Sequence, residues 1–181
     1  MRHLLWRICA LILLTSPALA GPPSQFVLPA TTTAYTAGQL MANSATGASV
    51  IVPSFNLNSM AGSSDIVLHR GELWISDTTA SSWNGQKITI DLWSAAPTFT
   101  TGDRTTFSPT TGTANHLAAF TCTLSSIYGD GVWGECTINN GSALIVSGNN
   151  PTQIFWTATA LTGSGTTGAS KTVTFLPEAV R

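Results

Sequence analysis

The side chains that could carry out chemistry are few in this sequence. Two histidines follow residue 20, His69 and His116, and neither belongs to a recognisable catalytic triad or to a Gly-x-Ser-x-Gly motif. A hydrolase that works through an activated serine or cysteine needs a base beside its nucleophile. Both histidines are therefore expected on the surface or at a strand edge, outside any catalytic site.

Carboxylates are the other candidates for acid and base chemistry, since glycoside hydrolysis uses two of them about 5 to 9 Å apart. No spacing marks such a pair, and Asp103 beside Arg104 is better explained as a loop salt bridge or a turn. The stretch 130–135 lacks the alternating oxygen ligands of a calcium loop. The sequence therefore predicts no catalytic residue, no cofactor site and no metal site. The carboxylates considered are Asp65, Glu72, Asp77, Asp91, Asp103, Asp130 and Glu135.

Two cysteines lie in strand-like runs on either side of a turn-forming Gly129-Asp130-Gly131. A hairpin centred on Gly129 places Cys122 directly opposite Cys136, within reach of a disulfide. We expect that disulfide in an oxidising compartment. Buried free thiols are the alternative, and a metal site would need two further ligands that are not apparent. The third cysteine, Cys9, lies in the N-terminal segment described below.

Two tryptophans occupy positions where exposure is expected. Trp93 falls on the polar face of the alternating pattern 86–94, and Trp83 precedes the turn-forming Asn84-Gly85. Exposed aromatic rings stack on sugars and anchor protein interfaces. Trp83 and Trp93 are therefore candidate surface-binding residues. The alternative is that each ring covers a hydrophobic strand end.

Residues 1–20 have the pattern of a secretory signal peptide. Two arginines flank the start, an apolar run spans 8–14, and Ala18-Leu19-Ala20 precedes Gly21. The apolar run is shorter than the ~20 residues that a membrane-spanning helix needs. We therefore expect cleavage before Gly21, an exported protein and no membrane span. An uncleaved N-terminal anchor is the alternative.

Charged residues make up only 8% of the chain, against roughly 25% in a typical globular protein. Without residues 1–20, five basic residues remain against eight acidic ones, a formal charge of −3. Five scattered cations are too few for the basic surface that neutralises nucleic-acid phosphates. The sequence therefore argues against a nucleic-acid partner.

Alternating apolar residues predict strands joined by turns. In 65–76 the apolar phase changes at Gly71, which predicts a bulge, and Pro53 predicts an edge strand or bulge within 49–57. Residues 36–43 are expected to form at most a short turn or helix, and 97–112 a long loop. Further strands are expected at 86–94, 116–127, 132–138, 143–146, 153–161 and 171–176. The pattern predicts one all-β domain of about eight strands, an antiparallel jelly-roll-like β-sandwich over 32–181 after an extended lead-in over 21–31.

Two short motifs match a known pattern. Thr33, Tyr35 and Gly38 match Thr-x-Tyr-x-x-Gly-Asp-Val, with Gln39 in place of the acidic residue. Ile88, Ile90, Leu92, Trp93 and Pro97 match Phe-x-Leu-x-Leu-Tyr-x-x-x-Pro. In these motifs and in segment order, most of 32–176 resembles a family of small β-sandwich proteins encoded among the structural genes of tailed bacteriophages and prophages. The resemblance implies a virion-associated role, such as capsid decoration, and brings no catalytic residues.

These observations predict a non-enzymatic protein that works by presenting a surface. The first expectation is a phage-type structural or decoration protein that binds a capsid or its own copies, as a homo-oligomer or within an assembly. The alternative is a secreted carbohydrate-binding or adhesin-like module that uses exposed tryptophans. An enzyme of the glycosidase class is the third. The protein is expected to be exported if the signal is used, and virion-associated if the resemblance holds.

Overall fold

The computed structural model describes residues 19–20, 24–30, 33–57, 65–76, 82–111, 113–128, 131–139, 144–146, 153–163, 165 and 170–180. All strand pairs in these residues are antiparallel, and the regular helical turns are short 3-10 segments. The predicted all-β, antiparallel, sandwich-like fold is confirmed. The longer strands are β2 (Ser24–Leu28), β5 (Ile66–Ile75), β6 (Lys87–Trp93), β9 (His116–Tyr128), β10 (Gly131–Ile138), β12 (Gln153–Ala160) and β13 (Lys171–Val180). The short strands are β1 (Leu19–Ala20), β3 (Leu40–Met41), β4 (Ser54–Asn56), β7 (Thr98–Phe99), β8 (Pro109–Thr111) and β11 (Leu144–Val146).

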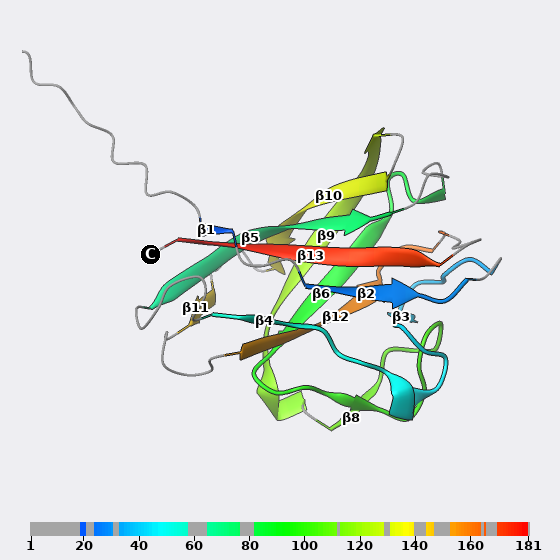
Figure 1. The fold of residues 1–181 in the computed structure, drawn as a ribbon, viewed down its shortest axis with the longest axis horizontal. Coiled ribbons are helices and arrows are strands. Elements are labelled where there is room, and N and C mark those ends of the chain that lie inside the picture. The colour runs from blue at the N-terminus through cyan, green and yellow to red at the C-terminus, as the bar shows by residue number, and fades with distance from the viewer. Residues whose placement is uncertain are drawn as a thin grey trace, which may run out of the picture.

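The strands curl into a nearly closed barrel. Their central order is β13-β5-β10-β9-β6-β12; β1 and β2 pair with β13, β11 pairs with β5, and β3 and β4 pair with β12. The two ends of this sheet meet, because β2 contacts β4 (Figure 1). Trp156 on β12 also donates a hydrogen bond from Nε1 to Ser24 Oγ on β2 (2.9 Å). Closure leaves fewer strand edges open to other chains.

The interior is filled by the apolar phase of each strand. On β6 these residues are Ile88, Ile90 and Leu92, all buried as the alternation predicts. At the centre, Phe175 packs against Trp156, with ring centroids 5.5 Å apart, and against Phe120 at 6.1 Å. Each fully buried aromatic ring of this kind contributes about 1.5–3 kcal/mol of hydrophobic stabilisation.

The Cys122–Cys136 disulfide is confirmed. The two cysteines are direct partners in the pairing of β9 with β10, as the reflection about Gly129 predicts. Both are fully buried. The turn residues Gly129 and Asp130 lie outside the described part of the chain. The bridge therefore links two long neighbouring strands across the inner face of the barrel.

The expected bulge in β5 is present. Arg70 pairs with Glu178 of β13 and Leu68 with Ala179, so His69 is an extra residue in β5. The extra residue returns both halves of the strand to one buried face, since Leu68 and the apolar residues after the bulge are all buried. Gly71 has a separate reason: a Cβ there would lie 2.7 Å from the ring of Phe175.

Two segments expected to lack strands form a lobe against the barrel. Residues 36–43 contain β3, which pairs with β12, and residues 97–111 contain β7 and β8, which pair with each other. The expected short turn is present, since the Gln39 amide donates a hydrogen bond to the Thr36 carbonyl (3.2 Å), but a strand follows it. The expectation of an uninterrupted loop over 97–112 is wrong. Strands of two or three residues are too short to show alternation. The lobe has its own apolar cluster of Leu40, Ala42 and Phe99, with Val50, Val52 and Phe107 packed against it.

A buried carboxylate holds this lobe together. Asp103 Oδ1 accepts hydrogen bonds from the Tyr35 hydroxyl (2.7 Å) and the Ala42 amide (2.9 Å). Arg104 Nε lies 3.2 Å from the other oxygen of Asp103, and its guanidinium stacks 3.9 Å from the centre of the Tyr35 ring. The expected salt bridge between Asp103 and Arg104 is confirmed. Burial is the main cause that raises the pKa of Asp103.

The expected lead-in contributes a strand. Residues 24–28 form β2, paired along β13, so this part of 21–31 is extended but belongs to the sheet. β1, inside the predicted signal peptide, pairs with Glu178 and Ala179 of β13. Residues 1–18 and 21–23 lie outside the described residues, and the signal peptide stays a prediction. Among the residues that the structure describes, no helix is long and apolar enough to cross a membrane.

Candidate functional site

The two tryptophans expected at the surface are buried, so that part of the prediction is wrong. Trp83 is only 1% exposed. Its ring packs against Tyr35, with centroids 5.9 Å apart, and against the backbone of Gly165, where a Cβ would lie 2.6 Å from the indole. Asn84-Gly85 does form a turn, with Gly85 at φ +75°, but Trp83 points inward from it.

Trp93 is buried for a different reason. It lies on the outer side of β6, as expected, but the lobe covers it and leaves it 2% exposed. Its ring packs 6.3 Å from Phe107 of the lobe and meets His116 edge-on at 4.9 Å. Its Nε1 donates a hydrogen bond to Thr157 Oγ1 at 3.0 Å. Neither Trp83 nor Trp93 is placed to meet a ligand.

Of the tryptophans in the described part of the chain, Trp74 and Trp133 are partly exposed. They are direct partners in the pairing of β5 with β10, on the outer face of the sheet. Gly131 makes room for the first ring, since a Cβ at that position would lie 2.4 Å from Trp74. The outward position of Trp133 follows from the alternation of side chains along a strand. Trp133 is three residues before the inward-facing Cys136 and therefore lies on the opposite face.

A polar pocket lies beside this tryptophan pair. The chain has three glutamates, and all three line it from neighbouring strands: Glu72 on β5, Glu135 on β10 and Glu178 on β13. Arg70, Gly71 and Trp133 complete the lining of a cavity of about 130 Å³. We call these six residues the glutamate pocket. In a chain with so few charges, this concentration is the most distinctive feature of the surface.

The charges in the glutamate pocket are only partly balanced. Arg70 forms an ion pair with Glu178 and has Nη1 4.0 Å from a carboxylate oxygen of Glu135. The hydrogen bond and charge of Glu178 raise the pKa of Arg70 further above its ordinary value. Glu72 is the direct cross-strand partner of Glu135, and like charges in that position destabilise a sheet. The pocket thus holds three carboxylates against one guanidinium.

Asp91 and His116 form an acid–base pair outside the glutamate pocket. His116 Nε2 lies 2.9 Å from Asp91 Oδ1, on the outer side of β6 and β9 beside Trp93. Burial is the main cause that raises the pKa of Asp91, and the contact with His116 opposes the rise. The His116 side chain is 38% exposed and meets the Trp93 ring edge-on, so the contact with Asp91 fixes the orientation of the imidazole against Trp93.

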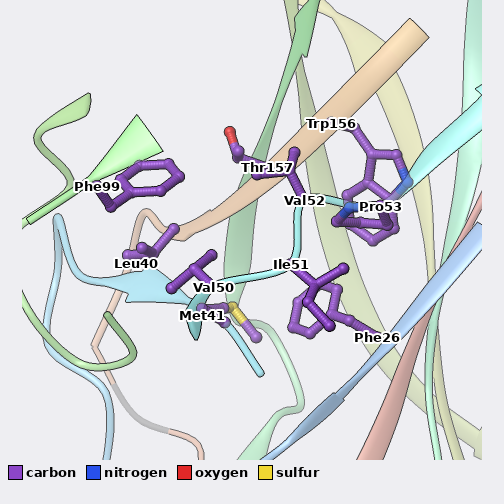
Figure 2. A pocket seen from close by; sticks show the side chains of 11 residues that line it. Phe26, Leu40, Met41, Val50, Ile51, Val52, Pro53, Phe99, Trp156 and Thr157 are labelled. Atoms are coloured by element: carbon purple, nitrogen blue, oxygen red, sulfur yellow. The ribbon is translucent and has the colours of Figure 1, made fainter. Parts of the chain in front are cut away.

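An apolar cleft lies between the barrel and the lobe. Figure 2 shows Phe26 and Trp156 on one side and Leu40 and Phe99 on the other, with the segment 50–53 running between them. Its free volume is about 10 Å³, which is room for about one water molecule. The cleft is therefore a packing seam with an exposed rim, where Ile51 is 70% exposed.

Within the described part of the chain, no three His, Cys, Asp or Glu side chains are placed to hold a metal ion. The glutamate pocket offers carboxylates as hydrogen-bond acceptors and anions, with the side chain of Trp133 in its lining. Comparison with known proteins adds nothing to this chemistry: no protein-family model, no curated protein and no solved structure matches the chain.

Proposed function

We propose that this protein is a non-enzymatic binding module that presents the outer face of its sheet, and that the glutamate pocket with the tryptophan pair recognises a carbohydrate. The observation that carries the proposal is the convergence of all three glutamates and Arg70 on one pocket walled by Trp133. Trp74 extends the aromatic surface along the same face. This keeps the expected role of exposed tryptophans and assigns it to different residues.

Sugar rings match this surface chemically. The C–H faces of sugar rings stack on indole rings. This contact buries apolar area while the sugar hydroxyls stay in contact with water. These hydroxyls donate to carboxylates and accept from a guanidinium, in hydrogen bonds that the ionised partner strengthens. A cavity of about 130 Å³ is on the scale of one ring. Sugar hydroxyls placed between Glu72 and Glu135 would also reduce the repulsion between these two carboxylates in the protein without ligand.

The test is retention on a broad array of glycans. The wild type should bind one sugar class, and Trp133→Ala should weaken binding at least tenfold, because losing about 1.4 kcal/mol of contact changes affinity by that factor. Glu135→Gln should weaken it as well. Leu161→Ala, which truncates an exposed apolar side chain outside the pocket, is the matched control and should bind normally.

Three results would contradict this proposal. Retention on no glycan would remove the carbohydrate role, and unchanged binding by Trp133→Ala would remove the site. Incubation with the bound glycan should leave it intact. Release of new reducing ends would show that the pocket is a glycosidase site and that the protein is an enzyme.

A second candidate function is assembly, as the resemblance to phage structural proteins implies. The observation that favours it is a set of exposed apolar side chains: Ile51 at the rim of the cleft, Ile145 on β11, Val27 on β2 and Leu161. Exposed apolar side chains mark a protein contact surface where they gather into one patch. Light scattering should then show a salt-insensitive homo-oligomer that Ile51→Ser dissociates. A monomer at all concentrations, without affinity for a capsid, would contradict this function.

A further inference from the structure

A line of hydroxyls leads away from the glutamate pocket across the sheet. Arg70 on β5 is paired with Thr137 on β10, and Thr137 is paired with Thr121 on β9. Thr121 is in turn paired with Thr89 on β6. We call Thr137, Thr121 and Thr89 the threonine row. Since cross-strand partners share a face, the row continues the line from Glu178 through Arg70.

The threonine row lies on the outer face of the sheet. Its members alternate with the buried Cys136, Cys122, Ile88 and Ile90, so their side chains point away from the core. Thr137 is exposed, and Thr121 and Thr89 are partly exposed. Thr159, the next residue along the line, has its hydroxyl oxygen covered. The line that a ligand reaches therefore ends at Thr89.

We propose that the ligand is a linear, uncharged polysaccharide whose chain crosses the strands, with one ring in the glutamate pocket and the following rings on the threonine row. This inference rests on the proposed carbohydrate-binding function. From β13 to β6 the line measures about 19 Å, from four interstrand spacings of about 4.8 Å each. It holds about four sugar rings, because one ring is close to one interstrand spacing in length.

The chemistry of the line selects the class of polymer. From Thr137 to Thr89 it has no charge, and each threonine offers a hydroxyl beside a methyl group. The Thr121 hydroxyl donates to Asn139 Oδ1 at 2.7 Å, which leaves its oxygen free to accept from a sugar hydroxyl. An anionic polymer would be repelled by the three carboxylates at one end of the line. A cationic polymer would gain from those carboxylates but not from the uncharged row.

Chain-length dependence separates the row from the pocket. Calorimetric titrations with neutral cello-, malto- and N-acetylated chito-oligosaccharides of one to six units would supply the ligands. For the series that binds, affinity should rise at least tenfold from one to four units and then level off. The Thr121→Val, Thr89→Val double variant should remove most of this rise while it leaves single-unit binding unchanged.

Two further variants complete the design. Trp133→Ala should weaken binding at every length, because it alters the pocket itself. Thr172→Val removes a hydroxyl six residues before Glu178 on β13, away from the row, and should match the wild type. If the wild type binds a single sugar unit and its affinity does not rise with oligosaccharide length, the extended site alone is overturned. The same holds if the Thr121→Val, Thr89→Val variant keeps the full rise in affinity. Binding of no oligosaccharide by the wild type would overturn the proposed function as well.

Discussion

Removal of the Cys122–Cys136 disulfide should cost a predictable amount of stability. The cysteines are 14 positions apart, and a loop of that size contributes about 3 kcal/mol in the chain-entropy description. A Cys122→Ala, Cys136→Ala double variant should therefore unfold with a free energy lower by about 3 kcal/mol. For a domain of this size the midpoint temperature should fall by about 6 to 12 °C. The native structure should persist, because strand pairing continues on both sides of the bridge.

Urea titrations followed by far-ultraviolet circular dichroism measure this loss. The slope of free energy against urea should rise in the variant, because the unfolded chain without its cross-link exposes more surface. Thr121→Ala with Thr137→Ala is a matched control, since this neighbouring cross-strand pair has no covalent link; it should lose less than about 1 kcal/mol. A loss in the cysteine variant no larger than the control's would refute the reasoning.

Three further predictions concern the lobe, the bulged strand and processing. Burial raises the pKa of Asp103, so the folded protein binds a proton at this carboxylate at a higher pH than the unfolded chain does. The contribution of Asp103 to the free energy of unfolding therefore increases as the pH falls from the raised pKa to about 4, the pKa of Asp in the unfolded chain. Asp103→Asn should flatten the pH dependence of the urea midpoint, and an unchanged profile contradicts this. Gly71→Ala should destabilise by about 1–3 kcal/mol, because its methyl group meets the ring of Phe175, and wild-type thermal stability would exclude that contact. The mass of the exported protein should correspond to a chain that starts at Gly21, whereas retention of Met1 would rule out cleavage.

Local patterns predicted most of the barrel. Period-two alternation predicts which face of each long strand is buried, and reflection about Gly129 predicts that Cys122 pairs with Cys136. Both predictions depend only on residues close together in the chain. The change of phase at Gly71 predicted a bulge within two residues of its position at His69. The lobe was beyond such reasoning, because β3, β7 and β8 are too short for a pattern and depend on Asp103 and tertiary contacts.

The site shows the same division between local and distant information. Alternation places Trp93 correctly on the outer side of β6, but only the fold shows that Phe107 covers it. The same rule indicates that Trp133 faces outward, and in the structure its side chain is partly exposed. The meeting of Glu72, Glu135 and Glu178 could not be read from the sequence. It depends on β13 pairing with β5 and β5 with β10, which joins segments far apart in the chain.

The most direct test of the carbohydrate-binding proposal is an NMR titration of the indole N–H resonances with the glycan that the array retains. Each tryptophan gives a separate signal, so the measurement reports which rings meet the ligand. The resonances of Trp74 and Trp133 should shift in a saturable way, and those of the buried Trp83, Trp93 and Trp156 should stay in place. Shifts confined to the buried rings, or no shift at either Trp74 or Trp133, would contradict the proposed site.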